Sequence, residues 1–107
     1  MAAFPVEFAD LEPLRGAWAI GDEAARNRKR LASSMADLQD FYNTLLARMD
    51  AIIQHLNARP LDALSPGEQA LLNLALTFME VAPAVEIYKH PDVPWGFAAE
   101  RFHILPA

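Results

Sequence analysis

The chain has 107 residues, of which 53% are hydrophobic and 21% charged, and its formal net charge is −5 at pH 7. This length and composition are typical of one globular domain with a modest core, so intrinsic disorder is not indicated. The lack of cysteine excludes a disulfide scaffold, thiol catalysis and thiolate metal sites, and the acidic balance argues against a nucleic-acid partner. We therefore expect a single domain over residues 1–107.

The residue types predict an all-α protein, a small helical bundle. Helix-favouring residues such as Ala, Leu, Glu and Arg dominate, and β-branched residues never alternate over the length of a strand. The first residues show no secretory signal, and the most apolar run is interrupted by Glu80 and Pro83, so it falls short of the roughly 20 residues that span a bilayer. A cytoplasmic protein without a membrane partner is the expectation.

The N-terminal segment, residues 1–21, is expected to form a short helix that packs one apolar edge. Its large apolar residues recur every three or four positions: Phe4, Phe8, Leu11, Leu14 and Trp18. That spacing suits one face of a helix, and Pro13 limits its regularity.

A long helix is predicted over about residues 22–58. Asp22 can cap its first turn, and Pro60 disfavours helical geometry in the residue before it. Its apolar residues are spaced alternately by four and three: Leu31, Met35, Leu38, Tyr42, Leu45, Met49, Ile52 and Leu56. This seven-residue repeat predicts one continuous helix inside a bundle.

A second, strongly apolar helix is predicted over about residues 66–89, antiparallel to the first. Ser65, Pro66 and Glu68 form the signature of a capping box with proline at the first helical position. Asn73, Thr77 and Glu80 form one narrow polar line, and most of the remaining circumference is apolar. Pro83 removes a backbone hydrogen bond, so the helix should kink or restart there.

The remaining residues, 90–107, are expected to form an extended arm, because they contain Pro91, Pro94, Gly96 and Pro106. Their apolar side chains would form an unusually large exposed patch unless they were docked. These side chains are Val93, Trp95, Phe97, Phe102, Ile104 and Leu105.

Length arithmetic favours a second copy or another protein partner. The apolar stripe of a straight long helix would span about 39 Å and the second helix about 26 Å, which leaves part of the stripe unpaired. The expected interface comprises Leu72, Leu76, Phe78, Met79, Trp95, Phe97 and Phe102. A compact monomeric bundle, with the N-terminal segment over the unpaired stripe, is the alternative.

No catalytic, cofactor or metal residue is predicted. Glu100 and His103 match one half of a carboxylate-bridged di-metal motif, but the sequence lacks the second half. His55 is expected to make a hydrogen bond at the core boundary and His90 to lie in a turn. Glu80 is the candidate buried acid, which should be paired with Asn73, Thr77 or a partner's cation.

Three functions remain open from the residues. The first is a non-enzymatic interaction protein, a homodimer or a small accessory subunit, that binds through the apolar helix and the arm. The second is a pocket for a small apolar ligand under an aromatic lid, with contacts from Trp18, Glu80, Trp95 and His103. The third is a regulator that binds an acidic protein or a phosphate group through Arg26, Arg28, Lys29 and Arg30. The alternative interpretation of these four cations is a solvated helix end without a partner.

Overall fold

The computed structural model describes residues 3–88, so the predicted arm over 90–107 lies outside the described residues. Within them, every element is helical, which confirms the all-α prediction. In chain order, the elements are the 3-10 helix η1 (Val6–Leu11), α1 (Glu12–Trp18), α2 (Glu23–Ala32), α3 (Met35–Leu46), α4 (Met49–Asn57), the 3-10 turn η2 (Leu61–Ala63), α5 (Pro66–Pro83) and the π-helical η3 (Ala84–Tyr88).

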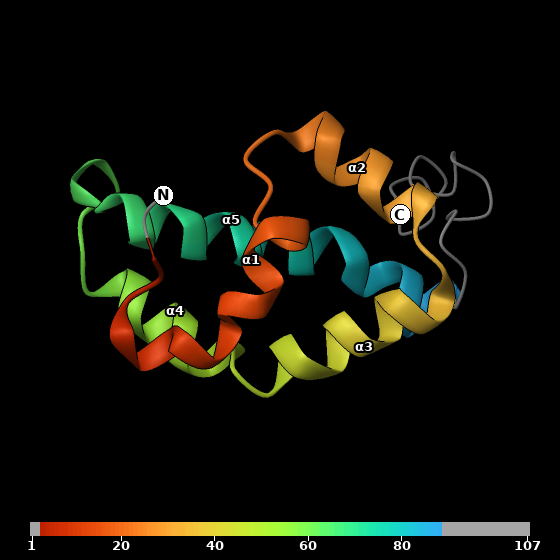
Figure 1. The fold of residues 1–107 in the computed structure, drawn as a ribbon, viewed down its shortest axis with the longest axis horizontal. Coiled ribbons are helices and arrows are strands. Elements are labelled where there is room, and N and C mark those ends of the chain that lie inside the picture. The colour runs from red at the N-terminus through yellow and green to blue at the C-terminus, as the bar shows by residue number, and fades with distance from the viewer. Residues whose placement is uncertain (1–2, 89–107) are drawn as a thin grey trace, which may run out of the picture.

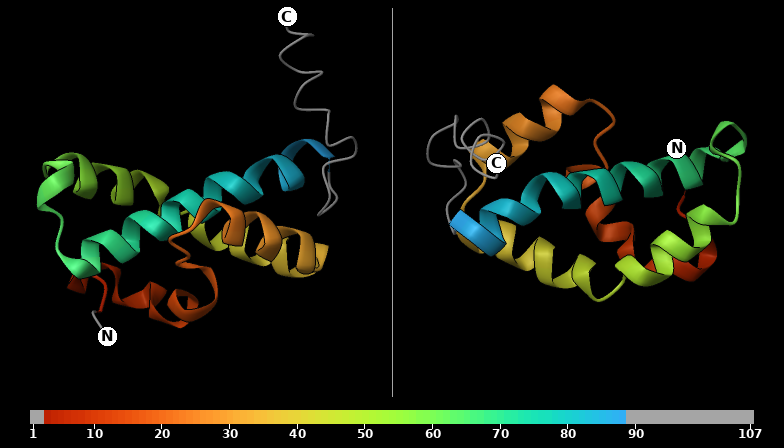
Figure 2. Two further views of the ribbon diagram at one scale, coloured as in Figure 1. Left: turned by 90° about the horizontal axis from the view of Figure 1, so that it is seen from above. Right: turned by 180° about the vertical axis from the view of Figure 1, so that it is seen from behind.

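The apolar helix α5 is the centre of the bundle, and α1, α2, α3 and α4 all contact it (Figure 1). The α3 and α4 helices run antiparallel to α5, one along each half of its length, as the sequence predicted for this pair of segments (Figure 1). Seen from behind, α4 and α5 lie at the front and the N-terminal elements lie beyond them (Figure 2).

The prediction of one continuous helix over 22–58 is wrong, because the chain breaks twice. At the first break, Ser33 and Ser34 are both extended, with ψ of 150° and 159°. Ser34 accepts a hydrogen bond from the backbone N–H of Asp37 at 3.1 Å and so caps α3. The second break falls at Ala47 and Arg48, between α3 and α4.

These breaks remove the unpaired strip on which the length argument for a partner rested. The α2 helix turns back over α5 instead of prolonging α3, so Leu31 is 46% exposed while Leu38, Leu45 and Ile52 are fully buried. The heptad pattern therefore identifies the buried face of α3 and α4, but it does not extend into α2.

The start and the end of α5 follow the sequence signals. The Ser65 hydroxyl accepts from the Glu68 backbone N–H at 3.1 Å, and the Ser65 backbone N–H donates to the Glu68 carboxylate at 3.0 Å. This reciprocal pair is the predicted capping box. The α-helix ends at Pro83 and continues as the π-helical η3, as expected from the proline's missing N–H.

The polar line of α5 is where α2 docks. Glu80 accepts hydrogen bonds from Arg30 Nε at 2.9 Å and from Asn27 Nδ2 at 3.3 Å. Thr77 is fully buried, and its hydroxyl donates to the Asn73 carbonyl at 3.0 Å. The polar residues of this apolar helix are therefore matched inside the chain by a polar neighbouring helix.

The N-terminal segment is an integral part of the core, as its spacing predicted. Phe4, Phe8, Leu11 and Trp18 are all buried. The backbone also comes very close to the first turn of α5, where a Cβ placed on Gly67 would lie 2.1 Å from the Ala3 carbonyl oxygen. Only glycine leaves room for this approach.

The span Pro66–Ile87 is long and apolar enough to cross a membrane by length and composition, so the expectation that this run is too short was wrong. The central helix of a globular fold passes the same test, and 44% of the relevant window is buried within the fold. This span is weak evidence for or against a membrane, and a cytoplasmic location stays a prediction.

Candidate functional site

Two regions of the described chain combine several chemistry-bearing or exposed apolar side chains. The first is an acid–histidine cluster formed by Glu7, His55, Arg59 and Glu68. The second is an apolar groove between α4, α5 and the connector that joins them. They lie on different faces of α4, because Ala51 and His55 line a cavity beside the N-terminal segment whereas Ile53 and Leu56 line the groove.

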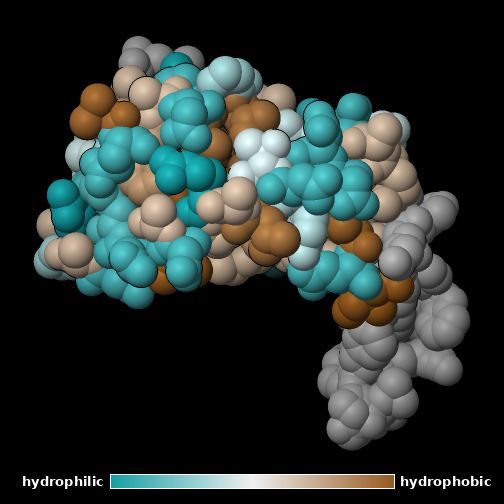
Figure 3. Space-filling view, turned by 90° about the horizontal axis from the view of Figure 1, so that it is seen from below, coloured by the Kyte–Doolittle hydropathy of each residue, from teal (hydrophilic) through white to brown (hydrophobic). Residues whose placement is uncertain are grey.

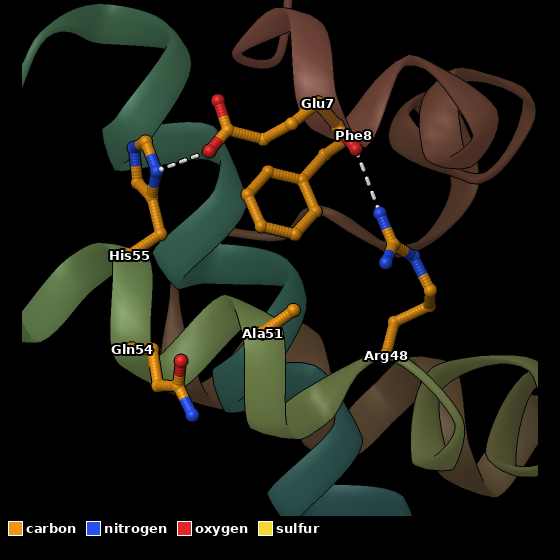
Figure 4. Close-up of a pocket in the computed structure, with 6 residues that line it drawn as sticks. All are labelled: Glu7, Phe8, Arg48, Ala51, Gln54 and His55. Atoms are coloured by element: carbon orange, nitrogen blue, oxygen red, sulfur yellow. Dashed lines mark hydrogen bonds and ion pairs between the residues drawn. The ribbon is translucent and has the colours of Figure 1, made fainter.

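His55 is the centre of the acid–histidine cluster. Its Nδ1 lies 3.1 Å from the Glu7 carboxylate (Figure 4). Its Nε2 lies 2.8 Å from the Glu68 carboxylate, and the His55 side chain is only 10% exposed. His55 therefore ties η1 to the first turn of α5 through one contact from each ring nitrogen.

Within the acid–histidine cluster, the carboxyl group of Glu68 has a strongly lowered pKa. Its pKa falls to about 2, first because the Ser65 backbone N–H donates to it, and further because His55 and Arg59 lie beside it, while burial acts in the opposite direction. Arg59 also forms an ion pair with the same carboxylate. A carboxylate with these partners stays ionised through the physiological range and has no spare proton for acid catalysis.

A cavity of about 380 Å³ lies beside this cluster, as Figure 4 shows. It is lined by Glu7, Phe8, Arg48, Ala51, Gln54 and His55. Arg48 donates to the Glu7 carbonyl at 2.7 Å and to the Asp10 carboxylate, so its charge is already paired within the protein. Nothing among these lining residues is a free nucleophile, and the described residues 3–88 contain no group that could hold a metal ion.

The cluster ties together elements that are distant in the sequence. Its charged groups meet each other across three elements, and the Phe8 ring packs edge-on against His55 at 5.5 Å. Local sequence signals could identify only the Ser65 and Glu68 part of it, because Glu7 and His55 are far apart in the chain.

We expect Glu68→Gln to flatten the acid dependence of stability. The folded pKa of about 2 is below the ordinary value of 4.5, so the carboxylate's contribution is complete above about pH 4.5 and is lost as the pH falls toward 2. Thermal midpoints at pH 7 and pH 3 should differ more for the wild type than for Glu68→Gln. Glu23→Gln, an exposed carboxylate in the first turn of α2, is the control, and equal slopes for all three proteins would contradict the assignment.

The four cations of the predicted docking patch are distributed among different contacts. Arg26 donates to the Ile20 carbonyl at 2.8 Å, Lys29 lies 4.6 Å from the centre of the Trp18 ring, and Arg30 is buried against Glu80. Arg28 is exposed. Three of the four therefore contact their own chain, and the docking of an anionic partner here stays a prediction.

The predicted ligand contacts are not gathered around one cavity in the described residues. Trp18 is buried and stacked on Phe41 at 4.2 Å between ring centres, and Glu80 is held by α2. Trp95 and His103 lie outside the described residues. The aromatic lid therefore stays a prediction.

The apolar groove has a volume of about 390 Å³. Its lining residues are Ile53, Leu56, Asn57, Arg59, Leu61, Leu64, Leu72, Ala75 and Met79. Ile53, Leu61 and Met79 are 43%, 73% and 55% exposed, so large apolar side chains surround one hollow. On the face shown in Figure 3, hydrophobic residues form separate groups with hydrophilic residues between them.

The groove contains part of the predicted interface. Leu72 and Met79 line it, and Leu76 is half-buried outside it. Phe78 is buried and stacked on Tyr42, so it is not available to a partner in this arrangement. Trp95, Phe97 and Phe102 lie outside the described residues. Sequence reasoning missed Leu61 and Leu64, although their place in a connector next to the apolar helix was visible.

Comparison with known proteins adds no assignment to either region. No protein-family model, no curated protein and no solved structure matches the chain.

Proposed function

We propose that the protein is a non-enzymatic helical interaction protein, a homodimer or a small accessory subunit, whose partner binds in the apolar groove. The observation that carries this proposal is the gathering of Ile53, Leu61 and Met79 around one hollow. Single exposed apolar residues are normal on protein surfaces, but contiguous ones in a hollow are typical of binding sites. The acid–histidine cluster supports the non-enzymatic part, since its groups are paired with one another.

The groove alone gives too little energy for a tight complex. Covering three apolar side chains that are about half exposed yields on the order of 3–5 kcal/mol in gross terms. Association costs about 4–15 kcal/mol in lost freedom of motion. A stable partner must therefore bury more than the groove. Further exposed apolar residues, Leu31 and Ile87, are available for such contacts.

A second candidate function is binding of a small apolar molecule in the same groove. Its volume lies within the range of about 300–1,000 Å³ that is common for ligand pockets, and most of its lining is aliphatic. The two candidates differ in oligomeric state, because a small ligand leaves the mass of the protein near that of one chain.

We expect Met79→Asp to abolish binding without unfolding the protein. Met79 lines the groove and is 55% exposed, so a charge there opposes burial by a partner but is tolerated in water. Light scattering during chromatography should give twice 11.9 kDa for the wild type, or a co-purifying partner, and one chain alone for the variant.

Leu46→Asp is the matched control, because Leu46 is 53% exposed on α3 and does not line the groove. It should keep the wild-type mass. A wild-type monomer without a partner contradicts the proposal, and so does equal behaviour of the two variants. A monomer that carries an apolar compound in native mass spectrometry, lost in Met79→Asp, would favour the second candidate.

A further inference from the structure

The apolar groove is polar at one end and apolar along the rest of its length. Asn57 and Arg59 are the polar residues among those that line it, and both lie where α4 ends and the connector begins. The other lining residues are apolar, and those on α5 extend from Leu72 to Met79. A few polar groups in a mainly apolar site fix the orientation of a ligand. The groove therefore suits a ligand with one polar end and an apolar tail.

We propose that the groove binds a free single-chain amphiphile with a carboxylate head, such as a medium-chain fatty acid. The head lies at Arg59 and the tail follows α5 toward Met79. This inference rests on the second candidate function, because it names the chemical class of the apolar ligand. Asn57 lies at the same end as Arg59, where its side-chain amide can donate to the head.

Arg59 supplies the positive charge that such a head requires. Its side chain is 42% exposed, and its Nε forms an ion pair with the Glu68 carboxylate. A guanidinium has five N–H donors, so a contact through Nε does not use those on the two Nη nitrogens. None of the described residues that line the groove is acidic. An anionic head is therefore the charge complement of the groove, whereas a cationic head would meet a like charge.

The Glu68 carboxylate opposes a second anion near Arg59, but its own charge is already compensated by several groups. The Ser65 backbone N–H donates to it at 3.0 Å, and His55 Nε2 lies 2.8 Å from it. These contacts reduce how much Glu68 depends on Arg59 alone. The planar arginine fork has donors on more than one side, so Arg59 can be shared between Glu68 and the head of a ligand.

The dimensions of the groove set the length of the tail. Glu68, the ion-pair partner of Arg59, precedes Met79 by eleven residues, which is about 16 Å along α5. An extended polypeptide advances about 3.5 Å over the three backbone bonds of a residue, so an extended hydrocarbon chain advances about 1.2 Å per bond. A chain of about 10–12 carbons therefore extends most of the way from Arg59 to Met79.

Calorimetric titration of the full chain with three ten-carbon probes tests the head group. The probes are decanoate, decanol and decylammonium, each kept below the concentration at which it forms micelles. We expect decanoate to bind at least tenfold more tightly than decylammonium and several-fold more tightly than decanol, because charge-assisted hydrogen bonds are the stronger ones. Dodecanoate should bind at least tenfold more tightly than octanoate, since each methylene that leaves water strengthens binding by up to about fourfold.

Two substitutions of Arg59 separate the head from the tail. Arg59→Gln should weaken decanoate binding about tenfold and change decanol binding less than twofold, so that decanol also reports whether the groove is intact. Arg59→Lys keeps the charge and should retain part of the preference for decanoate. Arg15→Gln is the matched control, because Arg15 is also paired with a carboxylate, that of Glu12, but does not line the groove. It should leave both affinities unchanged.

The tail is tested by Met79→Asp, which should weaken decanoate and decanol together, whereas Leu46→Asp should change neither. Decanol or decylammonium binding as tightly as decanoate would overturn the carboxylate head and leave the second candidate function standing. If none of the three probes bound to the wild type, both this inference and that candidate would be wrong. The light-scattering result for a protein partner is independent of these titrations, so the proposals fail separately.

Discussion

Replacing Phe8 with alanine is expected to lower the free energy of unfolding by about 3–5 kcal/mol. The ring is 1% exposed and forms part of the main core. His55 packs against it edge-on, and the Arg48 guanidinium lies 5.0 Å from its centre. Truncation therefore opens a cavity and also removes the surface on which the acid–histidine cluster rests. Urea unfolding measured by circular dichroism gives the change directly.

Val6→Ala is the matched control for this prediction. Val6 lies in the same 3-10 helix but is 87% exposed, so its truncation should change stability by less than about 0.5 kcal/mol. Similar losses for the two variants would show that the N-terminal segment is not packed as described. A large loss for Phe8→Ala alone supports a core that depends on this segment.

Replacing Glu80 with alanine should cost about 2–3 kcal/mol, because the change removes charge-assisted hydrogen bonds at a poorly hydrated site. Arg30 is the one residue of α2 that is buried, at 7% exposure, and its Nε donates to Glu80. The α2 helix is therefore held on α5 by polar contacts more than by apolar packing. Urea unfolding measures the loss of stability, and hydrogen exchange of the α2 amides shows whether α2 has loosened from α5.

Glu23→Ala supplies the comparison, since Glu23 lies in the first turn of α2 and is exposed. Glu23→Ala should lower the free energy of unfolding by only a few tenths of a kcal/mol, because it removes a negative charge that interacts favourably with the helix dipole. Faster exchange in α2 is expected for Glu80→Ala only. If α2 stays protected in that variant, the contact between Arg30 and Glu80 is not what holds the helix.

The two faces of the α4 and α5 pair have different roles in this interpretation. One face is covered by η1 and α1 and is tied down by His55, with Glu7 on one side and Glu68 on the other. The opposite face holds the apolar groove. Arg59 connects them, because it pairs with Glu68 and also lines the groove.

The sequence by itself determined the features that depend on neighbouring residues. The Ser65 capping box, the Asp22 cap, the helix end before Pro60 and the change of helix type after Pro83 all follow from local backbone chemistry. The heptad spacing also identified the buried face of α3 and α4, because apolar residues that recur on one side of a helix indicate the side that is buried on folding. Ser34 and Asp37 were a further local signal for a helix start, and it was missed within the stronger repeat.

Only the tertiary structure decided where the remaining chain turns and what is left exposed. The break at Arg48 accompanies its contacts with Glu7 and Asp10, which are distant in the sequence. Phe78 became core and Met79 surface because α3 packs on one side of α5 and leaves the other open. Two adjacent apolar residues have the same local pattern, so their roles depend on which neighbouring helix covers each one. The groove exists for this reason, since it is the part of the apolar helix that the described chain leaves uncovered.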